Sequence, residues 1–111
     1  MGELTLRQLQ EENKVWADHN FPDSKPYRPL LGAVEEIGEL AHAQLKSEQG
    51  IRGTQAEHHA AKIDAVADII IYLADYCNQA GIDMQSAVQK TWVRVRERDW
   101  KKDPQAGGES K

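Results

Sequence analysis

The sequence predicts an all-α protein, a four-helix bundle whose cover is completed by association with further copies of the chain. Apolar residues recur at the 3.6-residue spacing of helices in four separate segments, and proline or glycine separates these segments. No segment alternates apolar and polar residues as a half-buried strand would. Four amphipathic helices with short connections favour a bundle. The length of 111 residues allows one domain, which we expect to span residues 1–100.

The first predicted helix runs over residues 5–19. Thr5 and Gln8 have the spacing of a capping box, in which each side chain hydrogen-bonds to the other residue's backbone amide. Pro22 should end this segment, because proline has no amide hydrogen for the helical ladder. Residues 22–29 contain three prolines, so we expect no regular structure there.

The second predicted helix ends near Lys46 and carries one apolar stripe. Successive residues turn by about 100°, so its apolar side chains share a face that should pack inside the bundle. This stripe consists of Leu30, Val34, Ile37, Ala41 and Leu45. Residues 47–54 contain Gly50 and Gly53 and should form a loop.

The third predicted helix begins near Glu57, ends before Gly81 and is apolar almost all the way round. Four helices rarely cover one of their own members on two sides. We therefore expect a second subunit to pack against the bundle, giving a homodimer or homotetramer. The fourth helix should be capped by Asp83. Its inward stripe is expected to be Met84, Val88, Thr91 and Val95.

Residues 101–111 are polar except for one alanine, so ordering them would bury little apolar surface. We expect a flexible C-terminal tail.

The composition excludes several classes of partner. The formal net charge of −4, from 14 basic and 18 acidic residues, is the wrong sign for a protein that neutralises many nucleic-acid phosphates. The single cysteine, Cys77, cannot form an internal disulfide, which fits a reducing cytoplasm. No apolar run is long enough to cross a membrane, and the start of the sequence has no signal-peptide pattern. The sequence predicts a cytoplasmic protein that binds neither nucleic acid nor membrane.

Three acids share one stripe of the third predicted helix. Asp64, Asp68 and Asp75 fall within about 40° of one another around the helix axis. An acidic stripe is usually a solvated edge, but the flanking Ile71 and Tyr72 would bury Asp68. A carboxylate in such surroundings favours a cation as its partner.

The second predicted helix has its own acidic face. Glu35, Glu36 and Glu39 point away from the apolar stripe, and their like charges repel one another when nothing neutralises them. Two acidic faces on packed helices can supply the hard oxygen ligands that Mg²⁺ takes alongside water and substrate phosphates.

At these residues the chain resembles the MazG-like all-α nucleoside triphosphate pyrophosphohydrolases. Their mark is Glu-Glu-x-x-Glu on one helix and Glu-x-x-Asp on the next. Residues 35–39, Glu-Glu-Ile-Gly-Glu, match the first half, and Asp68 matches the second. The position three before Asp68 is Ala65, with Asp64 one residue earlier. The likeness covers roughly residues 30–100.

The resemblance implies a helical bundle that hydrolyses a nucleoside triphosphate to the monophosphate and pyrophosphate. It implies Mg²⁺, with Mn²⁺ as a possible substitute, held by Glu36, Glu39 and Asp68. Glu35 would lie nearby in the catalytic group. Asp64 is the candidate to replace the ligand that is missing at Ala65. Members of that family act on dUTP, dCTP or phosphoribosyl-ATP, and nothing in the sequence selects among such substrates.

The candidate phosphate contacts are basic. Lys90, Arg94 and Arg98 form a row with a spacing of four on the fourth helix, which could bind phosphate or could be a solvated face. In the resembling family a lysine on this helix reaches phosphate, which implies that role for Lys90. Arg94 stands where that family usually has asparagine. Arg52, in the loop Gly-Ile-Arg-Gly, could also close over phosphates.

The candidate base contacts are on the first helix. Trp16 could stack on a base, although a tryptophan on such a helix is more often part of the core. Asn13 and Asn20 could read the polar edge of the base.

Two other functions fit parts of the sequence. Glu39 and His42 form a Glu-x-x-His motif of the kind found in di-iron bundles, but that fold needs two such motifs and the later helices have none. A non-catalytic helical interaction module is the other alternative, and it would leave the acids without a purpose.

Overall fold

The computed structural model describes residues 2–105 and is built from four helices. They are α1 (Leu6–Asn20), α2 (Tyr27–Gln49), α3 (Gln55–Ala80) and α4 (Met84–Val95). Within residues 2–105 there is no strand. The prediction of an all-α protein with four helices is confirmed.

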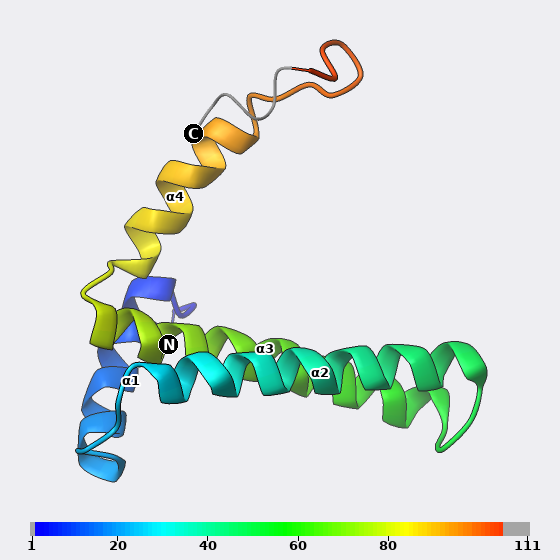
Figure 1. Ribbon diagram of the computed structural model, residues 1–111, viewed down its shortest axis with the longest axis horizontal. Coiled ribbons are helices and arrows are strands. Elements are labelled where there is room, and N and C mark those ends of the chain that lie inside the picture. The colour runs from blue at the N-terminus through cyan, green and yellow to red at the C-terminus, as the bar shows by residue number, and fades with distance from the viewer. Residues whose placement is uncertain (1, 106–111) are drawn as a thin grey trace.

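The arrangement of the helices is open (Figure 1). Helices α2 and α3 form a long antiparallel hairpin, α1 packs against α3 at one end, and α4 leaves that end and extends away from the hairpin. The radius of gyration is 17.3 Å, against about 13 Å for a compact domain of this length. One chain therefore leaves helical surface without cover.

Local capping sets three helix starts. The predicted capping box is present at α1, where the Thr5 amide donates to Gln8 Oε1 at 2.8 Å and the Gln8 amide donates to Thr5 Oγ1 at 3.1 Å. A second capping box, between Thr54 and Glu57, starts α3. Asp83 caps α4 as predicted, accepting from the Ser86 amide at 3.0 Å.

Helix α2 begins earlier than the sequence predicted. Its first residue is Tyr27, so Pro29 lies in the first turn and not in an irregular connection. Proline is tolerated there because the first amides of a helix have no carbonyl partner within it. The helix also continues to Gln49, and Gly50 closes it with a left-handed φ of 68°.

Small residues let the helices of the hairpin approach each other. The most buried apolar positions along the hairpin are alanines: Ala33, Ala43, Ala65 and Ala74. Gly32 on α2 lies against the Tyr72 ring of α3, so close that a Cβ added at Gly32 would be 2.5 Å from Tyr72 Cε1. This glycine fixes the spacing of the two helices beside Tyr72.

The predicted inward stripe of α2 is not covered within the chain. Its bulky members Leu30, Val34, Ile37 and Leu45 are all exposed, between 42% and 58%. The packing against α3 uses the neighbouring face of α2, which carries Ala33 and the partly buried Glu36. The periodicity identified an apolar face correctly, but the expectation that this face packs inside one chain was wrong.

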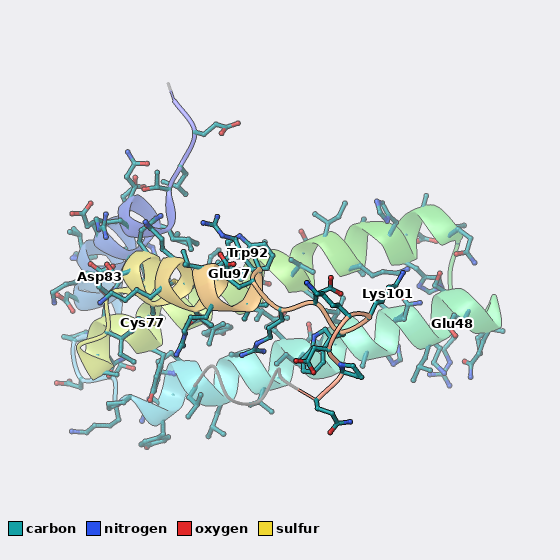
Figure 2. The ribbon with its side chains drawn as sticks, turned by 90° about the horizontal axis from the view of Figure 1, so that it is seen from above. Glu48, Cys77, Asp83, Trp92, Glu97 and Lys101 are labelled. Carbon is teal, nitrogen blue, oxygen red and sulfur yellow. The ribbon has the colours of Figure 1, made fainter. Side chains whose placement is uncertain are left out.

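Helix α4 differs from the prediction in the same way. Met84 is buried and Val95 is half-buried, but Val88 and Thr91 of the predicted inward stripe are exposed. Trp92, farther along α4 from Asp83, is 55% exposed (Figure 2). Hydrogen bonds join α1 to the start of α4 within residues 2–105, from Arg7 to Asp83, Gln85 and Ser86, so the later turns of α4 receive less cover from α1.

None of the described helices is both long enough and apolar enough to span a lipid bilayer. Of the predicted tail, residues 106–111 lie outside the described part of the chain.

Candidate functional site

A cleft of about 670 Å³ opens where α1 meets the hairpin. Its walls are the end of α1, the connection that follows it, the first half of α2 and the middle of α3. The lining residues are Asn13, Trp16, Phe21, Pro22, Asp23, Ser24, Arg28, Pro29, Glu36, Asp68, Ile71, Tyr72 and Asp75. This volume lies in the range of pockets that hold small ligands.

The cleft brings together one acid from each predicted acidic face. Glu36 of α2 is partly buried, and the Asp68 carboxyl of α3 lies close enough to affect its pKa. Asp68 itself is exposed, so the expectation that Ile71 and Tyr72 bury it was wrong; Ile71 is also exposed and gives it little cover. Burial raises the pKa of Glu36 above its ordinary value, and the negative charges of Glu39 and Asp68 raise it further. Two carboxyl groups in contact repel each other unless a proton or a cation lies between them.

Of the other predicted acids, only Asp75 lines the cleft. Glu35, Glu39 and Asp64 are exposed and do not line it. Asp75, two turns after Asp68, does line it, and its Oδ1 accepts from Gln79 Nε2 at 3.4 Å. Among residues 2–105, no group of three His, Cys, Asp or Glu side chains is placed to hold a metal ion. Four acids among the described residues, Asp23, Glu36, Asp68 and Asp75, line the cleft, but no three of them form a preformed metal cage.

Residue 65, the position three before Asp68, is not available to solvent. Ala65 is only 3% exposed, whereas Asp64 is exposed. A carboxylate introduced at residue 65 would enter a tightly packed position. Asp64 can therefore be reached by a cation from solvent, whereas residue 65 cannot.

The aromatic side of the cleft comes from the end of α1. The Trp16 and Phe21 rings meet edge to face with centroids 5.7 Å apart, and both are more than half exposed. The prediction that Trp16 is available to stack on a base is compatible with this position. Asn20 does not line the cleft, because its Nδ2 donates to the Trp16 carbonyl at 2.8 Å and closes the last turn of α1.

The basic residues predicted to contact phosphate do not line the cleft. Lys90, Arg94 and Arg98 lie on or after α4, and none of them lines the cleft. Arg52 lies in the loop at the far end of the hairpin, with a left-handed φ of 60°. Of the described residues that line the cleft, Arg28 alone carries a positive charge.

Sequence reasoning missed Arg28, Asp23, Ser24 and Tyr72. Arg28 was assigned to an irregular connection, and its place in the first turn of α2 could have been found only by allowing Pro29 inside the helix. Tyr72 did carry a signal, because it lies one turn after Asp68 on the same face.

Comparison with known proteins gives one informative similarity. No protein-family model matches the chain. A protein of Cyanophage S-2L named dATP/dGTP diphosphohydrolase is 28% identical over 96 residues. The match covers 86% of this chain and 78% of the phage protein, so it includes both helices that carry the acid pair.

Proposed function

We propose that this protein is a Mg²⁺-dependent nucleoside triphosphate pyrophosphohydrolase, which releases pyrophosphate and leaves a nucleoside monophosphate. The observation that carries this proposal is the cleft. Glu36 and Asp68 lie on one side of it, and the exposed Trp16 ring borders the same space. An acidic pair for a phosphate-bound cation and an aromatic surface for a base are the two parts that a nucleotide site needs.

The similarity to the phage diphosphohydrolase supports the same class of reaction. That protein is named for two purine deoxynucleoside triphosphates, dATP and dGTP. Purine nucleoside triphosphates are therefore the first substrates to test.

The residues present fit Mg²⁺ better than a metal that needs a complete protein cage. Mg²⁺ is usually bound by one or two carboxylates, with water and substrate phosphates completing its octahedron. Glu36 and Asp68 form such a pair, and their mutual repulsion would be relieved by a divalent cation. Glu39 and Asp64, each one helical turn from Glu36 and Asp68 respectively, are the further ligands we propose.

Each part of the cleft has a role in this reaction. Trp16 stacks on the base, and Arg28 binds an outer phosphate oxygen. Bound Mg²⁺ would supply positive charge to the phosphates and lower the pKa of a bound water. One of the acids Glu35, Glu36, Glu39 and Asp68 would accept the proton of the attacking water. Lys90, Arg94 and Arg98 would contact the leaving pyrophosphate only if an assembly brings α4 of one copy to the cleft of another copy.

The test is a panel of nucleoside triphosphates incubated with purified protein and Mg²⁺ or Mn²⁺. Pyrophosphate is measured separately from orthophosphate, and metal-free protein serves as the control. The proposal requires pyrophosphate from at least one substrate. Release of orthophosphate alone, or no product from any substrate with either metal, would overturn it.

A further inference from the structure

One buried amide in the cleft has its orientation fixed by the fold. Asn13 of α1 is only 6% exposed, yet it lines the cleft. Its Oδ1 accepts from Asn78 Nδ2 at 3.3 Å, and the same Asn78 nitrogen donates to the Gln10 carbonyl at 2.9 Å. A backbone carbonyl can only accept, so Asn78 must turn its nitrogen toward α1. Asn13 must then turn its oxygen toward Asn78.

This arrangement leaves the Asn13 nitrogen as a donor for the cleft. Within residues 2–105, Asn13 Nδ2 has no protein acceptor. The same part of the chain contains no buried side-chain nitrogen or oxygen that lacks a partner. Asn13 Nδ2 is therefore reached by solvent, and the open space beside Asn13 is the cleft.

The donor lies on the aromatic side of the cleft. Asn13 and Trp16 are three residues apart on α1, which places them on the same side of the helix, and both line the cleft. A base stacked on Trp16 would present its edge toward α1. The fixed amide of Asn13 is placed to read that edge.

We propose that Asn13 selects a 6-oxopurine base, guanine or hypoxanthine, over adenine; this rests on the proposed nucleotide hydrolysis. A carboxamide reads adenine through two bonds, accepting from the N6 amine and donating to N7. The bond from Asn78 turns the Asn13 oxygen toward α3, so the Asn13 nitrogen is the group that faces the cleft. Opposite position 6 of a purine, this donor meets an acceptor in O6 of a 6-oxopurine and a second donor in the N6 amine of adenine. Guanine and hypoxanthine present two acceptors, O6 and N7, on the edge where adenine presents one acceptor and one donor.

The test compares kcat/KM for dGTP, dITP and dATP in three forms of the protein. The wild type should prefer the two 6-oxopurine substrates by about 10-fold or more, the effect of one good base contact. Asn13→Asp replaces the donor with an acceptor of the same shape, so it should remove most of this preference. The ratio of two substrates in one protein is not changed by partial unfolding, which lowers both rates together.

Asn78→Asp tests the positioning role. The carboxylate introduced at position 78 has no hydrogen to donate to Asn13 Oδ1, so the Asn13 amide should turn its nitrogen to α3 and its oxygen to the cleft. The preference should then shift toward dATP. Gln89→Glu, the same chemical change at an exposed position of α4, should leave the ratio as in the wild type.

Failure of this inference is distinguishable from failure of the proposed function. Pyrophosphate release with equal use of dGTP and dATP, or a ratio unchanged in Asn13→Asp, would overturn the role of Asn13 and leave the hydrolysis standing. If no substrate is hydrolysed, calorimetric binding of dGMP against dAMP still decides the base preference. Equal affinities would then refute it.

Discussion

Glu36 and Asp68 meet only because α2 and α3 pack against each other. We expect Glu36→Gln and Asp68→Asn each to lower pyrophosphate release by more than about 100-fold, since even neighbours of metal ligands commonly contribute about 10- to 100-fold. Both changes keep the shape of the side chain and remove its charge. Turnover should be measured across a Mg²⁺ titration, because weakened metal binding is partly restored at high Mg²⁺.

The matched control is Glu12→Gln, at an exposed acid of α1 outside the cleft. It should keep the activity and the Mg²⁺ dependence of the wild type. Wild-type turnover in Asp68→Asn would show that the acid pair is not the metal site.

Part of the cleft could be predicted from single residues, because the relevant signals are local. The spacing of the acids predicted one acidic face on each helix, the family resemblance indicated Glu36 and Asp68 within these faces, and the first helix offered Trp16. The sequence could not show that α1 and the connection after it lie against these acids. Arg28 was missed for this reason: its contribution depends on tertiary placement and not on a motif.

At the scale of elements, Gly32 lets α2 approach α3 at Tyr72, and Tyr72 lines the cleft. The distance between the two helices therefore affects the shape of the cleft. Gly32→Ala would place a methyl group 2.5 Å from Tyr72 Cε1, so the ring or the helix must move. We expect it to lower the free energy of unfolding by about 1–3 kcal/mol, the usual effect of overpacking, and to reduce turnover. Chemical denaturation and the pyrophosphate assay measure the two effects.

Gly38→Ala is the control on the same helix. A Cβ at Gly38 meets nothing within 4 Å, so alanine should stabilise α2 by about 0.5–1 kcal/mol through its higher helix propensity. If both alanine variants stabilise the protein, α2 and α3 are less closely packed at Tyr72 than described.

The joint between α1 and α4 should respond to pH. A hydrogen bond from the Ser86 amide, and then the nearby Arg7 side chain 3.3 Å away, lower the pKa of Asp83 below its ordinary value of 3.8. The folded state therefore holds this proton less tightly than the unfolded state. The stabilisation is present above pH 3.8 and is lost as the pH falls through the lowered pKa.

Asp83→Ala should accordingly lower the Tm by a few degrees at pH 7, and its difference from the wild type should shrink as the pH falls toward 3. Thermal melts followed by circular dichroism give both values. Glu12→Ala serves as the control for loss of an exposed acid. A difference for Asp83→Ala that is the same at both pH values would contradict the assignment.

The elements themselves were predictable to the extent that their signals lie in neighbouring residues. The capping box of Thr5 and Gln8 and the cap at Asp83 are set by side chains within one turn, and both were correct. The face of α2 that packs against α3 was not predictable, because small residues such as Ala33 carry a weaker periodic signal than Leu30 and its stripe. Periodicity identifies an apolar face, but it does not say which molecule covers it.

For the whole molecule, the uncovered apolar face predicts association. The hairpin exposes aliphatic side chains on both of its helices: Leu30, Val34, Ile37 and Leu45 on α2 and Ile63, Val66 and Ile70 on α3. Extensive exposure of apolar side chains is typical of interaction sites. Because the same stripe recurs on every copy, a symmetric contact between copies can cover it on both.

We therefore expect a homodimer or a homotetramer at micromolar concentration, measured by sedimentation velocity. Ile37→Glu and Leu45→Glu place charges in the middle and near the end of the α2 stripe, so each should shift the equilibrium toward monomer because a buried unpaired charge opposes association. Gln89→Glu adds a charge on exposed α4 away from that stripe and should sediment as the wild type does. A wild type that remains monomeric and active would mean that the stripe tolerates water without a partner. A monomeric but still helical Ile37→Glu variant would place the contact on α2, because α2 would then have lost its partner and kept its fold.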